Sequence, residues 1–419
     1  MKVSVLAQTP YRELPDDFES KYESCVTTPW SLVDTEKIHA SFRDSLDQLM
    51  FAARSGFDGL AMTEHGQSSY DMVPNPSLMA SALAYATDAE SLDVAIYPVG
   101  RSLGKAKEPL RVAEEMAMID GITGGRLMAG FPIGLAYDAN INNGVPPIDT
   151  RARFDEGLAL VLRAWSEKEP FAFNGRFSQH RWVNIWPRPV QEPPPVWITG
   201  IGNPGTMQYA LENGFGFNYF GWFGIKTTGK RIFDRFWDMA EKLGQPRNPW
   251  RTSIIQTVCV GDDDADAERT YAKHVEYFFR KAFGAIPRER LFLPGGIALP
   301  GLQAIMRDPG DFGIYEELRT AGWQFLLDSG CVIAGGPDTV ADQLIDICQE
   351  HGIGHLVAIL QSGSMDRELT EKNTALFAER VLPRLRELWT DEDLPNHWWP
   401  QRLGGAPSLV GDTKKLEVA

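Results

Sequence analysis

One short stretch carries residue types that could do acid–base chemistry. Gly59 is followed by an apolar run, Leu60 to Met62, and shortly after it come Glu64 and His65. The glycine and the apolar run predict a short buried strand. Parallel α/β enzymes place catalytic groups at the carboxyl ends of such strands, so the acid and the histidine form a candidate site. A strand followed by an ordinary polar loop is the alternative interpretation of the same residues.

Two further stretches could hold a phosphate group. Gly200-Ile201-Gly202 follows one apolar run and precedes a helical segment, so its backbone N–H groups could approach a phosphate. Arg151 lies at the start of another predicted helix and could add a charged contact. A tight turn and a solvated arginine are the alternative interpretations. We find no carboxylate pair for glycoside hydrolysis, no His/Asp cluster for a metal and no serine-centred nucleophile turn.

The elements that would position these residues alternate regularly. Short apolar runs occur at residues 3–8, 60–62, 92–99, 126–131, 196–199, 215–220, 253–260 and 355–360, with helical segments between them. Eight strands alternating with helices predict an α/β fold, a (β/α)8 TIM barrel with insertions in the loops at its C-terminal face. A doubly wound open sheet is the alternative. That fold carries a glycine fingerprint after its first strand, where this chain has Gln8-Thr9-Pro10.

The barrel interpretation gives one domain at residues 1–388, with insertions at about 9–35 and 284–330 and a tail at 389–419. The insertions have little periodicity, and long loops of this kind are functional or disordered. The Trp398-Trp399 pair of the tail is expected to pack on the surface. Pro98 lies inside the third predicted strand and cannot donate to a ladder, so the strand should end or bulge there, and Tyr97-Pro98 is a candidate cis bond.

In a barrel the carboxyl ends of all strands converge on one face. The ends expected there are Gln8, Glu64-His65, Tyr97-Pro98, Phe131-Pro132, Gly200 to Gly202, Tyr219-Phe220 and Leu360-Gln361. This set is apolar and aromatic with few titratable groups. It suits a flat, partly apolar cofactor better than a sugar or a metal.

Bulk composition limits the partners. The 419 residues include 43% hydrophobic and 23% charged residues, which is ordinary globular composition, and the formal net charge is −15. A nucleic acid or an anionic membrane needs a basic face, so neither is expected as the main partner. Four scattered cysteines indicate neither a zinc site nor a disulfide framework, and a reduced cytoplasmic location is the expectation. No signal peptide or membrane span is expected.

Several stretches, in order, match one family. They are Gly56 to Gly59 leading to Glu64-His65, Pro109 to Glu114, Asp120 to Arg126 with Gly130, Arg151 to Glu156, Trp186 to Gln191, Gly335 to Asp338, and Phe377 to Pro383. The chain resembles the bacterial luciferase-like flavin-dependent monooxygenases over residues 1–388. The resemblance implies a (β/α)8 barrel that uses reduced FMN, supplied by a separate flavin reductase, and O2. The reaction it implies forms a C4a-peroxyflavin that oxidises a small organic substrate, here apolar or aromatic.

The resemblance also assigns site residues. The catalytic histidine of the family falls on His65, while a second family histidine is replaced by Gly66, which leaves space beside the ring. A cis peptide under the flavin maps near Tyr97 and Pro98, and the loop after the fourth strand maps to Phe131. The phosphate contacts map to Arg151 and to a loop that contains Gly200, Gly202 and Thr206. Pro132 and Ile133 stand where luciferase has a cysteine and an arginine, which argues against luciferase activity itself.

Other functions remain open within this resemblance. An F420-dependent oxidoreductase would transfer a hydride without oxygen. A non-catalytic flavin-binding partner subunit is a third interpretation, since the family includes heterodimers. A homodimer is the assembly that the resemblance implies.

Overall fold

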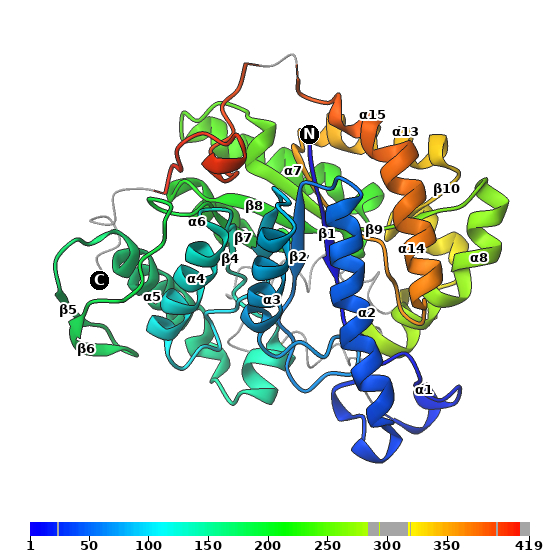
Figure 1. The fold of residues 1–419 in the computed structure, drawn as a ribbon, viewed down its shortest axis with the longest axis horizontal. Coiled ribbons are helices and arrows are strands. Elements are labelled where there is room, and N and C mark those ends of the chain that lie inside the picture. Colours follow the sequence, from blue (N-terminus) through cyan, green and yellow to red (C-terminus); the bar gives the residue numbers. More distant parts are fainter. Residues whose placement is uncertain (23–24, 284–292, 294–316, 319, 391–392, 411–419) are drawn as a thin grey trace.

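The computed structural model contains a parallel barrel surrounded by helices (Figure 1). It describes residues 1–22, 25–283, 293, 317–318, 320–390 and 393–410. The first part of the predicted insertion at 284–330 therefore lies outside the described residues.

Eight parallel strands form the barrel wall, which confirms the predicted (β/α)8 fold. They are β1 (Lys2–Ala7), β2 (Gly59–Met62), β3 (Ala95–Pro98), β4 (Ala129–Gly130), β7 (Val196–Gly200), β8 (Gly216–Phe220), β9 (Thr252–Val260) and β11 (His355–Ile359). Ladders run in the order β3-β2-β1-β11-β9-β8-β7-β4. A single bridge between Ile96 and Leu127 joins the two ends of this order, so the barrel is nearly closed.

Helices cover the outside of the barrel because each presents one apolar face to the sheet. They are α2 (Thr35–Arg54), α3 (Pro76–Ala89), α4 (Pro109–Thr123), α5 (Pro147–Ser166), α6 (Pro204–Glu212), α7 (Ile225–Lys242), α8 (Asp264–Tyr277), α13 (Pro337–His351) and α14 (Arg367–Leu376). Shorter helices are α1 (Phe18–Lys21), α12 (Trp323–Ser329) and α15 (Leu382–Arg386). One buried apolar cluster lies between strands and helices, and a second fills the barrel and its C-terminal mouth.

Three strands were absent from the sequence prediction. A hairpin of β5 (Phe171–Asn174) and β6 (Gln179–Val183) projects from the barrel between α5 and β7 (Figure 1). Strand β10 (Val332–Gly335) pairs with the second half of β9, beyond the residues of β9 that pair with β8. Its four residues directly precede a helix start, so the sequence pattern did not separate them from the helix.

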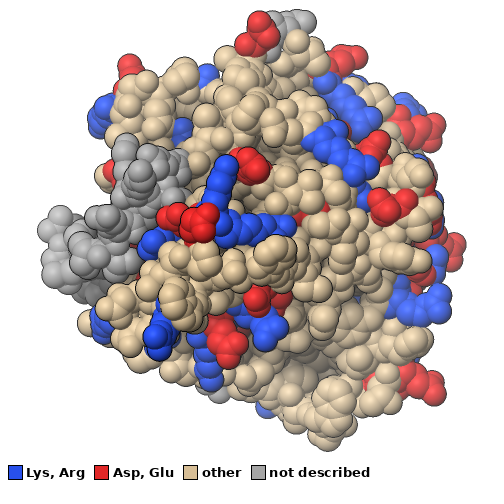
Figure 2. All heavy atoms as spheres, turned by 60° about the vertical axis from the view of Figure 1, so that its left-hand side comes forward, with Lys and Arg blue, Asp and Glu red and all other residues tan. Residues whose placement is uncertain are grey.

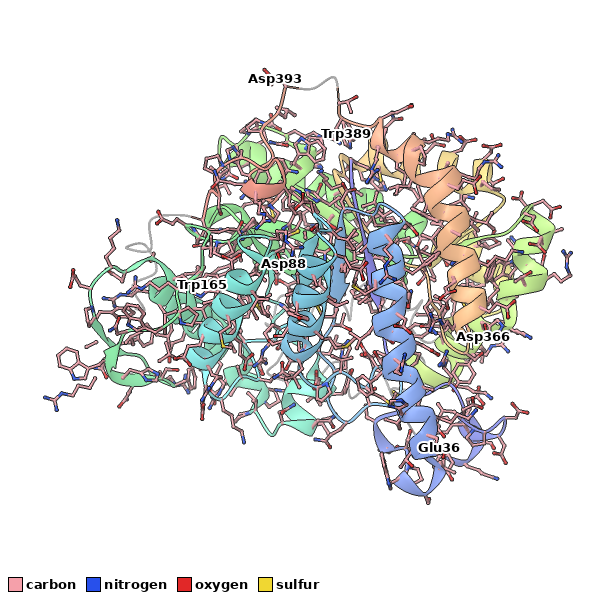
Figure 3. The ribbon with its side chains drawn as sticks, in the orientation of Figure 1. Glu36, Asp88, Trp165, Asp366, Trp389 and Asp393 are labelled. Atoms are coloured by element: carbon pink, nitrogen blue, oxygen red, sulfur yellow. The ribbon has the colours of Figure 1, made fainter. Side chains whose placement is uncertain are left out.

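The two ends of the barrel can be identified in Figure 3. Glu36 and Asp366, at the N-termini of α2 and α14, lie at the end where the strands finish. Trp389 and Asp393 lie at the opposite end, where the strands begin. The tail therefore folds under the N-terminal mouth of the barrel.

The Trp398-Trp399 pair is buried, where the sequence predicted surface packing. Trp197 donates its indole N–H to the Trp398 carbonyl at 3.0 Å, and Trp398 donates to the Gly214 carbonyl at 3.0 Å. Trp399 packs against His355 with ring centroids 5.6 Å apart. These contacts join the tail to strands β7 and β11.

Among the described residues, all four cysteines are buried and none forms a disulfide bond. The same part of the chain holds no group of three or more His, Cys, Asp or Glu side chains that could bind a metal. None of the described helices has both the length and the apolar character needed to cross a membrane.

Candidate active site

His65 lies at the C-terminal mouth of the barrel, three residues beyond the end of β2. Its ring packs against Tyr70, with centroids 4.8 Å apart, and lies nearly parallel to the ring of Tyr137. The side chain is 13% exposed. Sequence and structure therefore agree that β2 delivers His65 to this face.

Two tyrosines connect to His65 through a chain of hydrogen bonds. The hydroxyl of Tyr137 lies 3.0 Å from His65 Nδ1, and the hydroxyl of Tyr70 lies 2.6 Å from that of Tyr137. If Tyr137 donates to Nδ1, His65 carries its proton on Nε2; the opposite direction leaves Nε2 as an acceptor. Burial raises the pKa of both tyrosines well above the usual value, so they stay protonated and can serve as donors.

His65 is neutral at physiological pH. Burial, with a smaller contribution from the positive charge of Lys105, lowers the pKa of His65 to about 3. A neutral imidazole can accept a proton or hydrogen-bond a substrate, whereas it cannot supply a second proton. Because an imidazole with so low a pKa is a weak base near neutral pH, the site favours a role as a hydrogen-bonding group.

Glu64 points away from His65 into a set of buried cations. Its carboxylate accepts from Arg101 Nη1 at 3.1 Å and from the backbone N–H of Ser102 at 3.0 Å, and Lys105 Nζ lies 3.3 Å away. These partners satisfy the charge of Glu64. It is a structural anchor for the loop that follows β3.

Asp138 is the second buried carboxylate near His65. Lys105 Nζ lies 2.5 Å from its Oδ2, and His65 Nδ1 lies 3.9 Å from the same oxygen. Its Oδ1 faces the backbone N–H of Gly66 and the side-chain amide of Asn143, each at 3.4 Å. Burial raises the pKa of Asp138, and Lys105 opposes that rise.

The position of Gly66 is open on the side of His65. A Cβ atom there would come within 4 Å only of Asp138 Oδ1, at 3.4 Å. This is an ordinary contact distance, so the position of Gly66 has room for a Cβ atom beside Asp138.

Asp71 is a third buried carboxylate, in the loop that follows β2. It accepts hydrogen bonds from the backbone N–H of Thr9 at 3.2 Å and from the hydroxyl of Thr63. Burial raises the pKa of Asp71 to about 7. It joins the loops that follow β1 and β2.

Aromatic side chains form the wall beside His65. Phe278 lies edge-on to Tyr70 and to Trp222, at centroid distances of 6.4 and 4.6 Å. Phe279 continues this wall, and Trp222 donates its indole N–H to Thr257 Oγ1 at 3.0 Å. We call Tyr70, Tyr137, Trp222, Phe278 and Phe279 the aromatic wall.

The residues assigned to a phosphate group lie together on α5, α6 and the turn before α6. The guanidinium of Arg151 lies 5.1 Å from the ring centre of Tyr209, which is on α6. Its Nε bonds Asp155 at 2.8 Å, and within the described part of the chain no partner is recorded for its other two nitrogens. Arg151 therefore has donors available beside the start of α6.

The turn before α6 is tightly packed. Gly202 has a φ of +98°, which favours glycine, and a Cβ on Gly200 would lie 3.5 Å from Thr206 Cγ2. Thr206 is buried. Asn203 accepts from the N–H groups of Gly205 and Thr206, so these two donors are already used.

The remaining predicted site residues are Tyr97, Pro98 and Phe131. The Tyr97-Pro98 bond is trans, since the cis bonds of the described chain precede Pro187 and Pro193. Strand β3 nevertheless ends at Pro98, as predicted, and Tyr97 fills the barrel interior beside Trp197. The ring of Phe131 packs on Trp165 in the layer between strands and helices, so only its backbone faces the barrel mouth.

Sequence analysis did not identify Tyr70, Arg101, Lys105, Tyr137 or Asp138. Each lies between a correctly predicted strand, β2, β3 or β4, and the helix of the barrel that follows it; Tyr137 and Asp138 begin the short π-helix Tyr137–Asn142. The rule that catalytic groups follow barrel strands could have selected these loops. It could not have selected individual residues, because their contacts join loops far apart in the chain.

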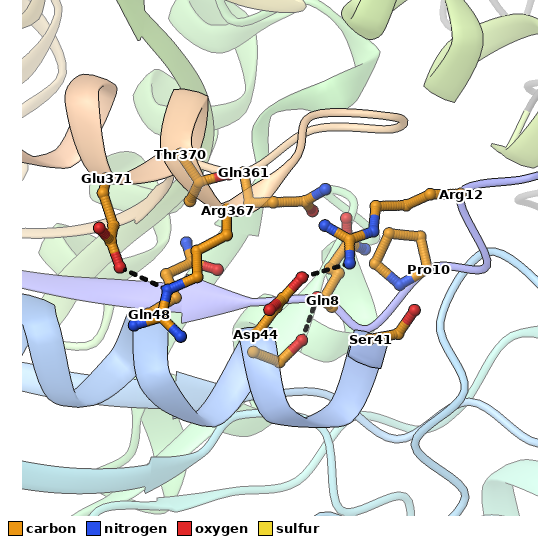
Figure 4. A pocket seen from close by; sticks show the side chains of 11 residues that line it. Gln8, Pro10, Arg12, Ser41, Asp44, Gln48, Gln361, Arg367, Thr370 and Glu371 are labelled. Atoms are coloured by element: carbon orange, nitrogen blue, oxygen red, sulfur yellow. Dashed lines mark hydrogen bonds and ion pairs between the residues drawn. The ribbon is translucent and has the colours of Figure 1, made fainter. Parts of the chain in front are cut away.

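A separate small pocket lies outside the barrel between β1, α2 and α14 (Figure 4). Gln8 and Gln361 line it, although the sequence placed both at the common mouth. Its volume of about 20 Å³ is room for about one water molecule. It is too small for a substrate.

The surface carries acidic and basic side chains side by side over the face shown in Figure 2. This face has no continuous basic region of the kind that nucleic acids require. The formal net charge of −15 agrees with that observation.

Comparison with known proteins gives a consistent result. The family model described as luciferase-like monooxygenase matches residues 24–355. The oxygenase component of a flavin-dependent trigonelline monooxygenase from Acinetobacter baylyi is 25% identical over 263 residues, which cover 62% of this chain and 70% of that protein.

Solved structures share the fold. The oxygenating constituent of 3,6-diketocamphane monooxygenase from Pseudomonas putida, in complex with FMN, superposes with a TM-score of 0.67 at 19% identity and covers 91% of this chain and 98% of its own. An F420-dependent secondary alcohol dehydrogenase superposes with a TM-score of 0.64 at 16% identity, covering 92% of this chain and 99% of its own.

Proposed function

Because the chain belongs to the luciferase-like monooxygenase family and is an oxidoreductase, we propose that it is the oxygenase of a two-component flavin-dependent monooxygenase. Reduced FMN would come from a separate flavin reductase and O2 would be the second co-substrate. The product would be an oxidised small apolar or aromatic molecule. The observation that carries the proposal is the neutral His65 at the barrel mouth, bonded to Tyr137 and enclosed by the aromatic wall.

The residues present fit an FMN molecule. Arg151 offers guanidinium donors beside the start of α6, and the helix N-terminus adds a favourable dipole for a phosphate. Gly200, Gly202 and Thr206 form the turn next to them. Tyr97, which fills the barrel interior, and the backbone at Pro98 and Phe131 would form an apolar floor beneath a flat ring system. When bound, reduced FMN supplies the electrons that activate O2.

The side chains around His65 would bind and orient the substrate and exclude water. His65 would accept a proton or hold the substrate by a hydrogen bond, a role typically worth about 10²- to 10⁴-fold in rate. The Tyr70–Tyr137 pair would orient the imidazole. The aromatic wall would bind the substrate and exclude water from the reacting atoms.

Two relatives support the choice of cofactor and partner. The trigonelline monooxygenase relative is described as an oxygenase component, which implies a partner that supplies reduced flavin. The diketocamphane monooxygenase structure contains FMN. The F420-dependent dehydrogenase of the same fold favours one second candidate, an F420-dependent oxidoreductase that transfers a hydride.

The test is a paired assay of the purified chain. With an FMN reductase, NADH and air, we expect consumption of O2 and an oxidised product from a panel of terpenoid and aromatic substrates. The same panel with reduced F420 under nitrogen should give no turnover. Anaerobic F420-dependent turnover, with no oxygenated product in the aerobic assay, would reverse the assignment.

We also assign a homodimer on the outer face of α3 and α4. Leu78 and Tyr85 on α3 are 73% and 74% exposed, and Met118 and Ile122 on the neighbouring α4 are also exposed. Exposed apolar side chains gathered on adjacent helices mark an association surface. Sedimentation should give twice the chain mass for the wild type and the single-chain mass for Tyr85→Asp. A monomeric wild type would exclude this assembly.

A further inference from the structure

Lys105 occupies the position that decides the charge of His65. Its ammonium contacts Asp138 Oδ2 at 2.5 Å, and that oxygen is the same one that lies 3.9 Å from His65 Nδ1. The lysine and the histidine therefore compete for one carboxylate oxygen. The side chains of Lys105 and Asp138 are 6% and 3% exposed, so water screens neither charge well.

We propose that Lys105 is a positioning residue that neutralises Asp138 and thereby keeps His65 a neutral imidazole, bonded to Tyr137, during turnover. This inference rests on the proposed function for its catalytic meaning. The geometry of the three side chains stands independently of that function.

No other cation can replace Lys105 at Asp138 within the described part of the chain. Arg101 is the next cation on the same loop, and its Nη1 and Nε bond Glu64 and Glu115, each at 3.1 Å. Asp138 Oδ1 has only the neutral N–H groups of Gly66 and Asn143. Without Lys105, the nearest group able to become a cation beside Oδ2 is His65 itself.

The groups that surround His65 come from four segments. Tyr70 and Asp71 follow β2 together with Glu64, which precedes His65 directly. Arg101 and Lys105 follow β3, Tyr137 and Asp138 follow β4, and Cys25 lies on the short helix Cys25–Thr27. Burial already disfavours protonation of His65, and the positive charge of Lys105 adds to that effect. Loss of the lysine removes this charge and exposes His65 to an unpaired carboxylate.

The consequence for the reaction is specific. A neutral His65 can accept a proton from the substrate, and a protonated His65 cannot. A variant without the Lys105 charge should therefore need a higher pH for full activity. The expected low-pH limb belongs to His65 and Asp138 as a coupled pair.

The test measures the protonation of His65 directly by NMR of the full-length protein with labelled histidine. The chain has seven histidines, and a His65→Asn variant identifies the signal. In the wild type we expect His65 to remain neutral from pH 5 to 9. In Lys105→Met we expect its pKa to rise by two units or more, so that it titrates within this range.

Matched variants make the test selective. Lys107→Met removes an exposed lysine of the same loop and should leave the His65 signal unchanged. Lys105→Arg retains the charge and should also keep His65 neutral. Lys105→Met/Asp138→Asn removes both charges and should return His65 to the neutral form. If Lys105→Met fails to fold, Lys105→Gln removes the charge while keeping a donor for Asp138, and the same rise is expected.

An unchanged His65 titration in both Lys105→Met and Lys105→Gln would overturn the inference, and it would mean that Asp138 takes up the proton instead. This outcome is separate from failure of the proposed function. A wild type that does not oxidise any substrate with reduced FMN, while His65 titrates as expected in the variants, would reject the function and keep the positioning role.

Discussion

At the scale of single residues, the chemistry of His65 depends on its neighbours. Burial and a nearby cation keep it neutral, and a tyrosine hydroxyl contacts Nδ1. Two carboxylates lie close by, yet Glu64 is used by Arg101 and Asp138 by Lys105. The imidazole is therefore left neutral and able to hydrogen-bond a bound molecule, while both carboxylates are paired with cations.

Tyr137→Phe should remove the hydrogen bond to His65 while keeping the ring. We expect product formation per reduced flavin to fall about tenfold, equivalent to about 1.4 kcal/mol, which is the size of one buried neutral hydrogen bond. Flavin affinity should stay the same. Quantifying product and hydrogen peroxide in the same reaction gives the measurement, and Tyr22→Phe, which removes a hydroxyl from a ring packed on Phe18 in a separate apolar cluster, is the control. Equal product yields in Tyr137→Phe and wild type would remove Tyr137 from the site.

Asp71 should make the stability of the protein depend on pH. Its pKa of about 7 in the folded protein exceeds the value of about 3.9 expected in the unfolded chain. The folded state thus holds the proton more tightly, so the contribution of Asp71 is most favourable below pH 4 and is lost as pH rises to 7.

Asp71→Asn imitates the protonated acid and should not show this loss. Relative to wild type, its free energy of unfolding should improve between pH 4 and pH 8 by up to about 4 kcal/mol, for a difference of three pKa units. Urea unfolding at pH 4.5, 6 and 8 measures the change. If the unfolding free energies of the two proteins changed by the same amount with pH, Asp71 would not titrate in this range.

At the scale of elements, α5 and α6 cooperate to present Arg151. The helix α5 follows β4 and α6 follows β7, and these two strands are neighbours in the barrel. The ring of Tyr209 on α6 lies beside the guanidinium of Arg151 on α5. The proposed phosphate site would therefore depend on the packing of the two helices, which a single motif cannot encode.

Arg151→Ala should weaken FMN binding about 10- to 100-fold, because a charge-assisted contact to a phosphate contributes about 1.5–3 kcal/mol. The turnover rate at saturating flavin should change little. Arg163→Ala is a closely matched control, since Arg163 is on the same helix, is equally 38% exposed and also pairs with an acid four residues on. Fluorescence titration with FMN measures both affinities. Equal affinities for the two variants would place the phosphate elsewhere.

At the scale of the whole molecule, the barrel is closed at its N-terminal mouth by its own tail. Trp398 and Trp399 contact residues of β7, β11 and the loop before β8, so segments from distant parts of the chain meet there. The site lies at the opposite mouth. Stability and chemistry are thus separated along the barrel axis, as is usual for this fold.

Trp399→Ala should lower the free energy of unfolding by about 3–5 kcal/mol, because it empties a fully buried site. Trp182→Ala, at an exposed position of the β5–β6 hairpin, should change it by no more than about 0.5 kcal/mol. Chemical unfolding monitored by circular dichroism compares the two. FMN affinity should be retained in both variants under native conditions. A small effect of Trp399→Ala would mean that the tail is not part of the cooperative unit.

The sequence by itself determined the barrel and which residues follow the ends of its strands. Eight apolar runs were enough to predict the eight wall strands. Each wall strand is covered by the barrel interior on one face and by helices on the other, so it must be apolar whichever side chains it contacts. The same reasoning placed His65 at a strand end and Arg151 at a helix start. The strand β10 was missed because its four residues directly precede a helix start, and the β5–β6 hairpin was missed because its short segments carry no pattern distinct from neighbouring loops.

Only the tertiary structure decided which groups act on His65 and where several side chains point. Lys105, Tyr137 and Asp138 reach His65 from loops 40 to 73 residues away along the chain, and Phe131 turns into the helix layer. It also showed a trans bond at Tyr97-Pro98 and a buried Trp398-Trp399 pair. The physical reason is that the order of apolar and polar residues in a segment indicates which of its positions are buried. Protonation and hydrogen bonding depend on partners brought together only when the barrel closes.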